Sequence, residues 1–360
     1  MRPRARDLGI GFAGTPGPHD AITDVPGVSV GYTTIIRGEG ALVVGHGPVR
    51  TGVTAIHPRG LTSHEPVLAG WCALNGNGEL TGTHWIDESG FLEGPVLLTN
   101  THSVGVVSAA VVAWQARTGR LFQPYSYPVV GETYDGRLND INGFHVTAEH
   151  ALAAIEGASD GPIAEGNVGG GTGMVCFGFK GGTGTASRLV EVPGAGVYTV
   201  GVLVQANFGT RDQLVIAGVP VGREIPGEPS PASPAEQGSI IVVIATDAPL
   251  LSHQLERVAR RAGLGIGRTG GIGGNGSGDI MLAFSTANPG AATADPIARI
   301  EMLANSRINP LFDATIQSTE EAIVNALVAA ETMRGIDELV VTALPHDRLR
   351  EAMARYRRRD

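Results

Sequence analysis

The chain changes character abruptly within GREIPGEPSPASPAEQGSIIVVIATD, residues 222–247. Residues 222–238 are rich in proline, glycine and charged residues and have no apolar period, which predicts an exposed flexible linker. Residues 239–247 form a β-branched run that is typical of a strand covered on both faces. Because the switch falls between Gly238 and Ser239, we interpret Ser239 as a candidate nucleophile that is created by cleavage of the chain.

Cleavage before a serine would supply a base together with the nucleophile. The new α-amino group, with an ordinary pKa of about 7.7–8, could remove the proton from the hydroxyl of the same residue. The junction alone leaves a simpler interpretation open, in which Ser239 only begins a strand after a surface loop.

Composition narrows the class of protein. The chain has 360 residues, 42% of them hydrophobic, 53 glycines and a formal net charge of −9. The acidic balance argues against a nucleic-acid partner. No stretch approaches the length of a membrane span, and no basic segment leads into an apolar signal region, so we expect a cytoplasmic protein. Cys72 and Cys176 stand in apolar contexts and are expected to be reduced core thiols.

The same survey gives no support for a bound metal or cofactor. The ten histidines are scattered without metal-ligand spacing. A G-x-G-x-x-G match at residues 265–270 follows a helical pattern rather than a strand, so a dinucleotide site is rejected.

Strand-like and helical patterns interleave along the chain, which favours layered α/β architecture. The part after Gly238 is too small to bury a large core alone, so one shared core is expected. The helix predicted most firmly covers residues 317–333, with Ser318 as its N-cap and Glu321 completing a capping box.

Three polar clusters are candidates for chemistry. Ser277 and Asp279 precede a strand and, in extended chain, project to one side, where they could orient an amine and a hydroxyl. Asn207 ends the run VGVLVQAN and could donate an amide proton to an oxyanion. Glu132 and Tyr134 lie in the loop GETYDG, where the carboxylate could hold a substrate ammonium. A turn or a strand end explains each cluster equally well when it is taken alone.

Taken together, several motifs resemble one family. They are DLGIGFAGTPGPHDAITDVPGVSVGYTT at 7–34, EGNVGGGTGM at 165–174, VGVLVQANFG at 200–209, the stretch from Gly238 to Gly271, and GNGSGDIMLAFSTAN at 274–288. Over most of its length the chain is similar to the DmpA-type L-aminopeptidase/D-amidase/D-esterase family, which includes the β-peptidyl aminopeptidases.

The resemblance implies a fold and a processing event. The fold is a four-layer αββα sandwich similar to that of N-terminal nucleophile hydrolases, with different connectivity. One domain, residues 1–360, would cut itself at Gly238–Ser239 into an α peptide, 1–238, and a β peptide, 239–360, that begins at the nucleophile. Members of the family form homotetramers.

The resemblance also implies roles for the candidate residues. Ser239 matches the nucleophile, Ser277 and Asp279 its polar partners, Asn207 the oxyanion amide, and Glu132 and Tyr134 the substrate-binding loop. The activity implied is release of N-terminal residues, L-, D- or β-, from peptides, amides or esters with a free amino end, through an acyl-enzyme and without a cofactor.

Two alternatives stay open at this point. The first is an acyltransferase of the ornithine acetyltransferase type, although such enzymes typically carry threonine at the junction where this chain has Ser239. The second is a non-catalytic binding protein whose linker is merely exposed.

Overall fold

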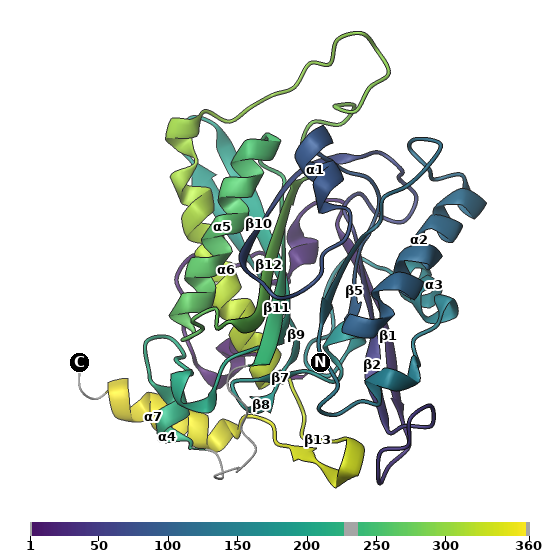
Figure 1. The fold of residues 1–360 in the computed structure, drawn as a ribbon. Coiled ribbons are helices and arrows are strands. Elements are labelled where there is room, and N and C mark those ends of the chain that lie inside the picture. The colour runs from purple at the N-terminus through teal and green to yellow at the C-terminus, as the bar shows by residue number, and fades with distance from the viewer. Residues whose placement is uncertain (1, 227–236, 358–360) are drawn as a thin grey trace.

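Two β-sheets lie face to face at the centre of the molecule, and helices cover the outer face of each sheet (Figure 1). The structure is a computed structural model that describes residues 2–226 and 237–357. The αββα layering expected from the resemblance is confirmed.

The larger sheet has six strands in the order β4-β3-β12-β11-β10-β9. β11 pairs with β10 in antiparallel and with β12 in parallel orientation. The strands span β3 (Val67–Gly76), β4 (Phe91–Leu92), β9 (Gly182–Val192), β10 (Gly196–Asn207), β11 (Gln237–Thr246) and β12 (Gly276–Ser285). The segment after Gly238 therefore supplies two central strands of a sheet whose other strands come from before it.

The smaller sheet has four strands in the order β1-β2-β5-β6. These are β1 (Ser29–Arg37), β2 (Val49–His57), β5 (Val96–Asn100) and β6 (Val129–Thr133). Two short hairpins complete the strands: β7 (Val175–Cys176) with β8 (Phe179–Lys180), and β13 (Met333–Arg334) with β14 (Val340–Val341).

Two helices cover each sheet. The six-stranded sheet packs against α5 (Ser252–Arg268) and α6 (Asn309–Val328), and the four-stranded sheet against α2 (Val104–Thr118) and α3 (Ala148–Glu156). The remaining helices are α1 (Thr83–Ser89), α4 (Val221–Glu224) and α7 (His346–Arg357). In the described part of the chain, no helix combines the length and the apolar character that a membrane crossing requires.

Alternation along β11 explains its apolar sequence. Ile240, Val242 and Ile244 belong to the core beneath α5 and α6, whereas Ile241 and Val243 belong to the core between the two sheets. The strand is thus covered on both faces, as its sequence predicts. Because side chains alternate along a strand, Ser239 lies on the face that is turned toward the smaller sheet.

The prediction for the helix at 317–333 is wrong at both ends. The helix is α6, which begins at Asn309 with Pro310 in its first turn and ends at Val328. Proline fits there because the first helical N–H groups need no partner within the helix. Ser318 and Glu321 are therefore buried in the middle of the helix and form no capping box.

The exposed linker predicted for residues 222–238 is also partly wrong. Its first residues form α4, in which Gly222 is buried. Gly222 packs so closely against the carbonyl of Arg211 that a side chain at this position would overlap it. Ile225 is buried in the core. At the other end, Gln237 and Gly238 already belong to β11. Residues 227–236, the middle of the predicted linker, lie outside the described residues.

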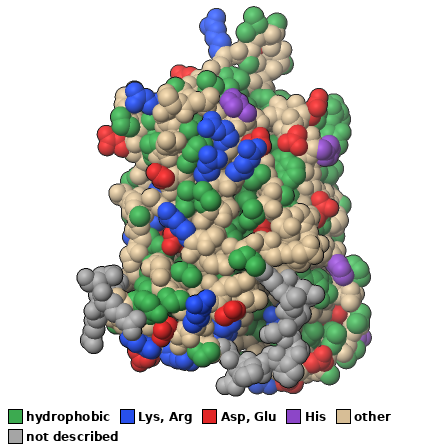
Figure 2. All heavy atoms as spheres, turned by 60° about the vertical axis from the view of Figure 1, so that its left-hand side comes forward, with side chains coloured by type: hydrophobic (Ala, Val, Ile, Leu, Met, Phe, Trp, Pro, Cys, Tyr) green, Lys and Arg blue, Asp and Glu red, His purple; other side chains and the backbone are tan. Residues whose placement is uncertain are grey.

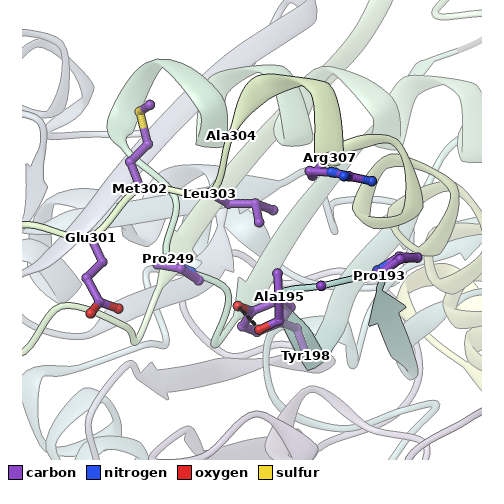
Figure 3. Close-up of a pocket in the computed structure, with 10 residues that line it drawn as sticks. Pro193, Ala195, Tyr198, Pro249, Glu301, Met302, Leu303, Ala304 and Arg307 are labelled. Carbon is purple, nitrogen blue, oxygen red and sulfur yellow. Dashed lines mark hydrogen bonds between the residues drawn. The ribbon is translucent and has the colours of Figure 1, made fainter.

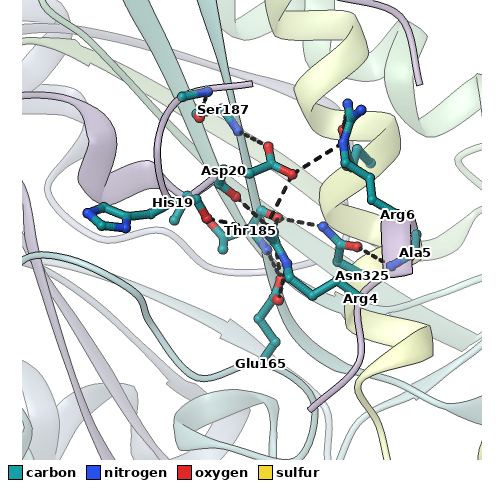
Figure 4. Close-up of polar contacts among 12 residues, drawn as sticks. Arg4, Ala5, Arg6, His19, Asp20, Glu165, Thr185, Ser187 and Asn325 are labelled. Carbon is teal, nitrogen blue, oxygen red and sulfur yellow. Dashed lines mark hydrogen bonds and ion pairs between the residues drawn. The ribbon is translucent and has the colours of Figure 1, made fainter. Parts of the chain in front are cut away.

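A buried polar cluster attaches the N-terminal segment to the larger sheet and to α6 (Figure 4). Glu321 on α6 accepts from Arg6 and from Arg188, each at 2.6 Å, and its side chain is completely buried. Arg4 pairs with Glu165 at 2.7 Å. Glu321, which the sequence predicts to be a capping residue, is instead the carboxylate that Arg6 and Arg188 share.

The face of the molecule that bears α5 and α6 carries no large patch of one charge. Figure 2 shows, on the side that bears α5 and α6, basic, acidic and hydrophobic side chains intermingled. The net charge of −9 is therefore not gathered on this face.

Replacing Glu321 by glutamine should lower the free energy of unfolding by about 3–5 kcal/mol, because the buried Arg188 loses its 2.6 Å carboxylate partner and keeps only the longer pair with Asp20 at 3.5 Å. Glu256→Gln is the matched control, because Glu256 forms an exposed pair with Arg260 and should cost less than about 0.5 kcal/mol. Urea denaturation followed by circular dichroism measures both. Equal small losses would contradict a structural role for the buried cluster.

Candidate active site

Ser239 lies near the start of β11, between the ends of two neighbouring strands. Its backbone is opposite Asn207 of β10 and beside Gly278 of β12. Its hydroxyl donates to the carbonyl oxygen of Gly238 at 2.7 Å and accepts from the N–H of Gly278 at 3.2 Å. The hydroxyl therefore lies directly beside the carbonyl of the peptide bond that precedes it.

Gly238 is required by a close approach between strands. A side chain at this position would overlap the carbonyl oxygen of Asn207 and crowd Phe208. The neighbouring strand β10 therefore leaves no room for a Cβ atom at position 238.

Asn207 is held at the end of β10 by contacts with two other segments. Its Oδ1 accepts from the N–H of Val175 at 2.7 Å, and its Nδ2 donates to the carbonyl of Tyr134 at 2.9 Å. An amide with both ends engaged has a fixed orientation, and its second N–H hydrogen is the one that an oxyanion would use.

Ser277 and Asp279 form the pair that the sequence predicts. The hydroxyl of Ser277 donates to Oδ1 of Asp279 at 2.7 Å, and both side chains are buried. Ser277 is in register with Gly238, so the pair begins beside the Gly238–Ser239 peptide bond. Asn75 Nδ2 donates to the carbonyl of Ser277 and anchors this end of β12 to β3.

Glu132 lies near the end of β6 with its carboxylate buried. One oxygen accepts from the N–H of Glu79 at 3.0 Å, and the other accepts from the hydroxyl of Thr101. Burial raises the pKa of Glu132 above its ordinary value, while the Thr101 hydroxyl and the Glu79 N–H oppose that rise because they favour the charged form.

Gly78 lies between the Glu132 carboxylate and the backbone beside Ser239. A methyl group on Gly78 would lie 3.2 Å from Glu132 Oε1 and 3.2 Å from the Cα of Gly278, the residue that donates to Ser239. On the strands themselves, a side chain at Gly131 would touch Ile241 at 3.3 Å. Packing of β6 against β11 thus brings Glu132 to the same end of the sheet interface as Ser239.

Tyr134 helps to hold the Asn207 amide through its backbone carbonyl. Its carbonyl accepts from Asn207, while the residue as a whole is 46% exposed. The sequence placed Glu132 and Tyr134 in one loop, but Glu132 lies within β6, one residue before its end. Of the two side chains, only that of Glu132 is buried.

Sequence reasoning missed the groups that orient these side chains. Thr101 and the N–H of Glu79 hold Glu132, and the N–H of Val175 holds Asn207. The polar end of the apolar run at 94–101 was a signal for Thr101. Backbone donors such as those of Glu79 and Val175 leave no signal in residue type.

A separate surface cavity of about 510 Å³ lies beyond the other end of β11, lined among others by Pro193, Tyr198, Pro249 and Arg307 (Figure 3). Pro249 follows the C-terminal end of β11, so the cavity is remote from Ser239. Within residues 2–226 and 237–357, no cluster of three or more histidine, cysteine or acidic side chains could hold a metal ion.

The family and the relatives that this chain resembles are all described as peptidases. The model of a family described as peptidase family S58 matches residues 20–341. A beta-peptidyl aminopeptidase, BapA, of Sphingosinicella microcystinivorans is 56% identical and covers 99% of this chain and 93% of its own. A protein of the same name from Sphingosinicella xenopeptidilytica is 50% identical, with coverage of 99% and 92%.

A solved structure agrees with the fold. The L-aminopeptidase D-Ala-esterase/amidase of Ochrobactrum anthropi superposes with a TM-score of 0.92 at 51% identity, over 99% of each chain. That structure is described as a new variant of the Ntn hydrolase fold and as a prototype for the serine aminopeptidases. This description agrees with the expected fold, which is similar to that of N-terminal nucleophile hydrolases but differs in connectivity.

Removing the Thr101 hydroxyl should raise the pKa of Glu132 further. Thr101→Val deletes a donor that favours the carboxylate, and a bond of this kind is worth about 1.5–3 kcal/mol, so the midpoint should rise by roughly one pH unit or more. Thr101→Ser keeps the hydroxyl and should titrate like the wild type. Carboxyl ¹³C NMR against pH, with the signal assigned by Glu132→Gln, measures the midpoint. An unchanged midpoint in Thr101→Val would contradict the geometry.

Proposed function

This chain belongs to peptidase family S58 and is an aminopeptidase, and we propose that it activates itself by cutting the Gly238–Ser239 bond and then uses Ser239 as its N-terminal nucleophile. One observation carries the proposal. The Ser239 hydroxyl lies 2.7 Å from the carbonyl oxygen of the bond to be cut.

Self-cleavage proceeds in two steps. The Ser239 oxygen attacks the Gly238 carbonyl carbon, an ester bond forms as the Gly238–Ser239 amide bond breaks, and the nitrogen of Ser239 takes up the proton. Water then hydrolyses the ester, which leaves the Gly238 carboxylate and a free Ser239 with its own α-amine. Residues 1–238 and 239–360 remain together because β11 and β12 are central in the shared sheet.

Turnover repeats this chemistry on a substrate. The α-amine accepts the proton of the Ser239 hydroxyl, whose oxygen attacks the carbonyl that follows the substrate's first residue. The protonated amine passes its proton to the departing amino group, and water hydrolyses the acyl-enzyme. We assign the oxyanion to Asn207, because it stands opposite Ser239 with a fixed amide.

We assign Ser277 and Asp279 to the α-amine of Ser239. Ser277 is in register with Gly238, and cleavage of the Gly238–Ser239 bond frees the α-amine beside it. Asp279 accepts a hydrogen bond from the Ser277 hydroxyl. A carboxylate behind a hydroxyl keeps the hydroxyl oriented and favours the protonated amine that forms during attack.

Glu132 is proposed to bind the substrate's ammonium group. It is a buried carboxylate beside the Ser239 region with two donors already in place, so a cation would complete its partners. Tyr134 is proposed to border the substrate pocket, because its backbone holds Asn207 and its side chain is partly exposed. The substrates are small L-, D- or β-amino acids at the free amino end of peptides, amides or esters, in line with the names of the relatives.

The relatives favour this function over the two alternatives. They are named aminopeptidases, and none of those described above is named an acyltransferase or a binding protein. Serine at position 239 also argues against the acyltransferase alternative.

We further propose a homotetramer of processed units in the cytoplasm. The connection between β12 and α6 projects from one end of the sandwich and exposes Ile297, Ile300 and Met302 (Figure 1). Exposed apolar groups of this kind are suited to an interface with another copy. The thiols of Cys72 and Cys176 are free, as a reducing compartment would keep them.

Purified protein should consist of two peptides, residues 1–238 and 239–360, when intact mass is measured under denaturing conditions. Ser239→Ala removes the attacking oxygen and should remain a single inactive chain. A wild-type protein that is fully active as an uncut polypeptide would sink the mechanism.

Glu132→Gln should mature normally, because the precursor presents no ammonium group, yet lose the preference for free amino ends. The loss of a charge-assisted contact corresponds to about 1.5–3 kcal/mol, roughly 10- to 100-fold in kcat/KM. The comparison uses one substrate and its N-acetylated twin on both proteins. Glu79→Gln, which removes a nearby exposed carboxylate and keeps the N–H donor, should retain the wild-type preference. The assignment of Glu132 is wrong if its variant does so too.

A further inference from the structure

Lys180 is a completely buried ammonium group that the mechanism above does not use. It ends β8, and its Nζ donates to three backbone carbonyls, those of Met174 at 2.8 Å, Gly181 at 2.9 Å and Gly171 at 3.5 Å. Among the residues that the structure describes, no carboxylate forms an ion pair with it. Three donors and three acceptors match, so its hydrogen-bonding capacity is met without a counter-charge.

Such a group is costly to bury. Desolvation lowers the pKa of Lys180 to about 7, which shows that the surroundings disfavour the charge. A methionine or leucine would fill the same space without this cost.

One of these carbonyls belongs to the peptide group that holds Asn207. Lys180 donates to the carbonyl of Met174, and the N–H on the other side of the same planar peptide is that of Val175. That N–H donates to Oδ1 of Asn207 at 2.7 Å. A continuous chain thus runs from the ammonium through one peptide group to the side-chain amide of Asn207.

The chain has a consistent direction. The three carbonyl acceptors match the three N–H donors of protonated Lys180. In that form, the positive charge at the carbonyl end polarises the Met174–Val175 peptide and makes its N–H a stronger donor. A stronger donor at Oδ1 polarises the Asn207 amide in turn and strengthens donation from Nδ2. Nδ2 is the atom that faces Tyr134 and that the mechanism assigns to the oxyanion.

We propose that Lys180 is a positioning residue for the oxyanion site, which orients and polarises the Asn207 amide through the Met174–Val175 peptide group. The inference rests on the proposed function, because it needs Asn207 to stabilise the oxyanion. Lys180 itself touches no reacting atom.

A purely structural role for Lys180 makes different predictions. Three carbonyls of one segment, residues 171–181, meet at its ammonium, so its removal could simply loosen that segment. A loosened segment would lower stability and activity whether or not residue 207 carries an amide. An effect transmitted through Asn207 disappears when that amide is absent.

A double-mutant cycle separates the two roles. Lys180→Met should lower kcat about 10- to 100-fold with KM changed less than about threefold, since removal of one oxyanion donor costs about 10²–10³ and this change only weakens it. On an Asn207→Ala background, the same substitution should change kcat less than about threefold. Equal losses on both backgrounds, or no loss in Lys180→Met alone, would overturn the proposal.

Two further variants complete the cycle. Cys176→Ala removes a buried side chain from the same hairpin without touching the chain to Asn207, and should keep kcat near the wild-type value. Lys180→Gln retains a donor without the charge and replaces Lys180→Met in the cycle if the methionine variant does not fold. Wild-type kcat in Asn207→Ala would overturn the oxyanion assignment, and this inference with it.

A second measurement does not depend on catalysis. In uncleaved Ser239→Ala protein labelled with ¹⁵N-valine, the amide proton of Val175 should move upfield when Lys180 is replaced by methionine or glutamine, because its hydrogen bond to Asn207 weakens. Cys176→Ala should leave it in place. An unmoved Val175 signal would overturn the link from Lys180 to Asn207 even if the proposed function is correct.

Discussion

The active site depends on the way the start of β11 is fixed between β10 and β12. Antiparallel pairing puts Ser239 opposite Asn207, and parallel pairing puts Gly238 beside Ser277 and Ser239 beside Gly278. The register of a buried strand is strongly specified, because a slip of one residue would turn its apolar side chains to the wrong face. Ile241 and Val243 on one face, with their alternating neighbours on the other, therefore fix the position of Ser239, the proposed nucleophile, as well as the core.

Around this frame, the site collects buried polar groups that each need a partner. Glu132 keeps its carboxylate with the help of a hydroxyl and a backbone N–H, and Asn207 keeps its orientation with a donor on one side and an acceptor on the other. Polar groups fixed in advance in this way do not have to reorganise when charge develops in the reaction.

Much of this arrangement could be predicted from the sequence, and the reason lies in local pattern. The β-branched run after Gly238 predicts a doubly covered strand, which the structure shows. The spacing of Ser277 and Asp279 predicts that their side chains project to one side, and in the structure they form a hydrogen bond with each other. The remainder depended on contacts distant in sequence. Thr101 and Val175 act on residues more than thirty positions away. The buried face of α4 and the early start of α6 likewise follow from tertiary packing and a proline in the first turn, which overrode the linker composition and the apparent capping box.

The central claim is that the reacting group is the hydroxyl of a serine that has become the N-terminus of its own chain. The most direct measurement is acid-quenched turnover of a slowly hydrolysed ester that has a free amino end, followed by intact mass and peptide mapping. The account predicts that the peptide 239–360 gains one acyl group and that the group maps to Ser239. An acyl group on any other residue, or turnover whose rapid first phase leaves no acylated peptide, would contradict it.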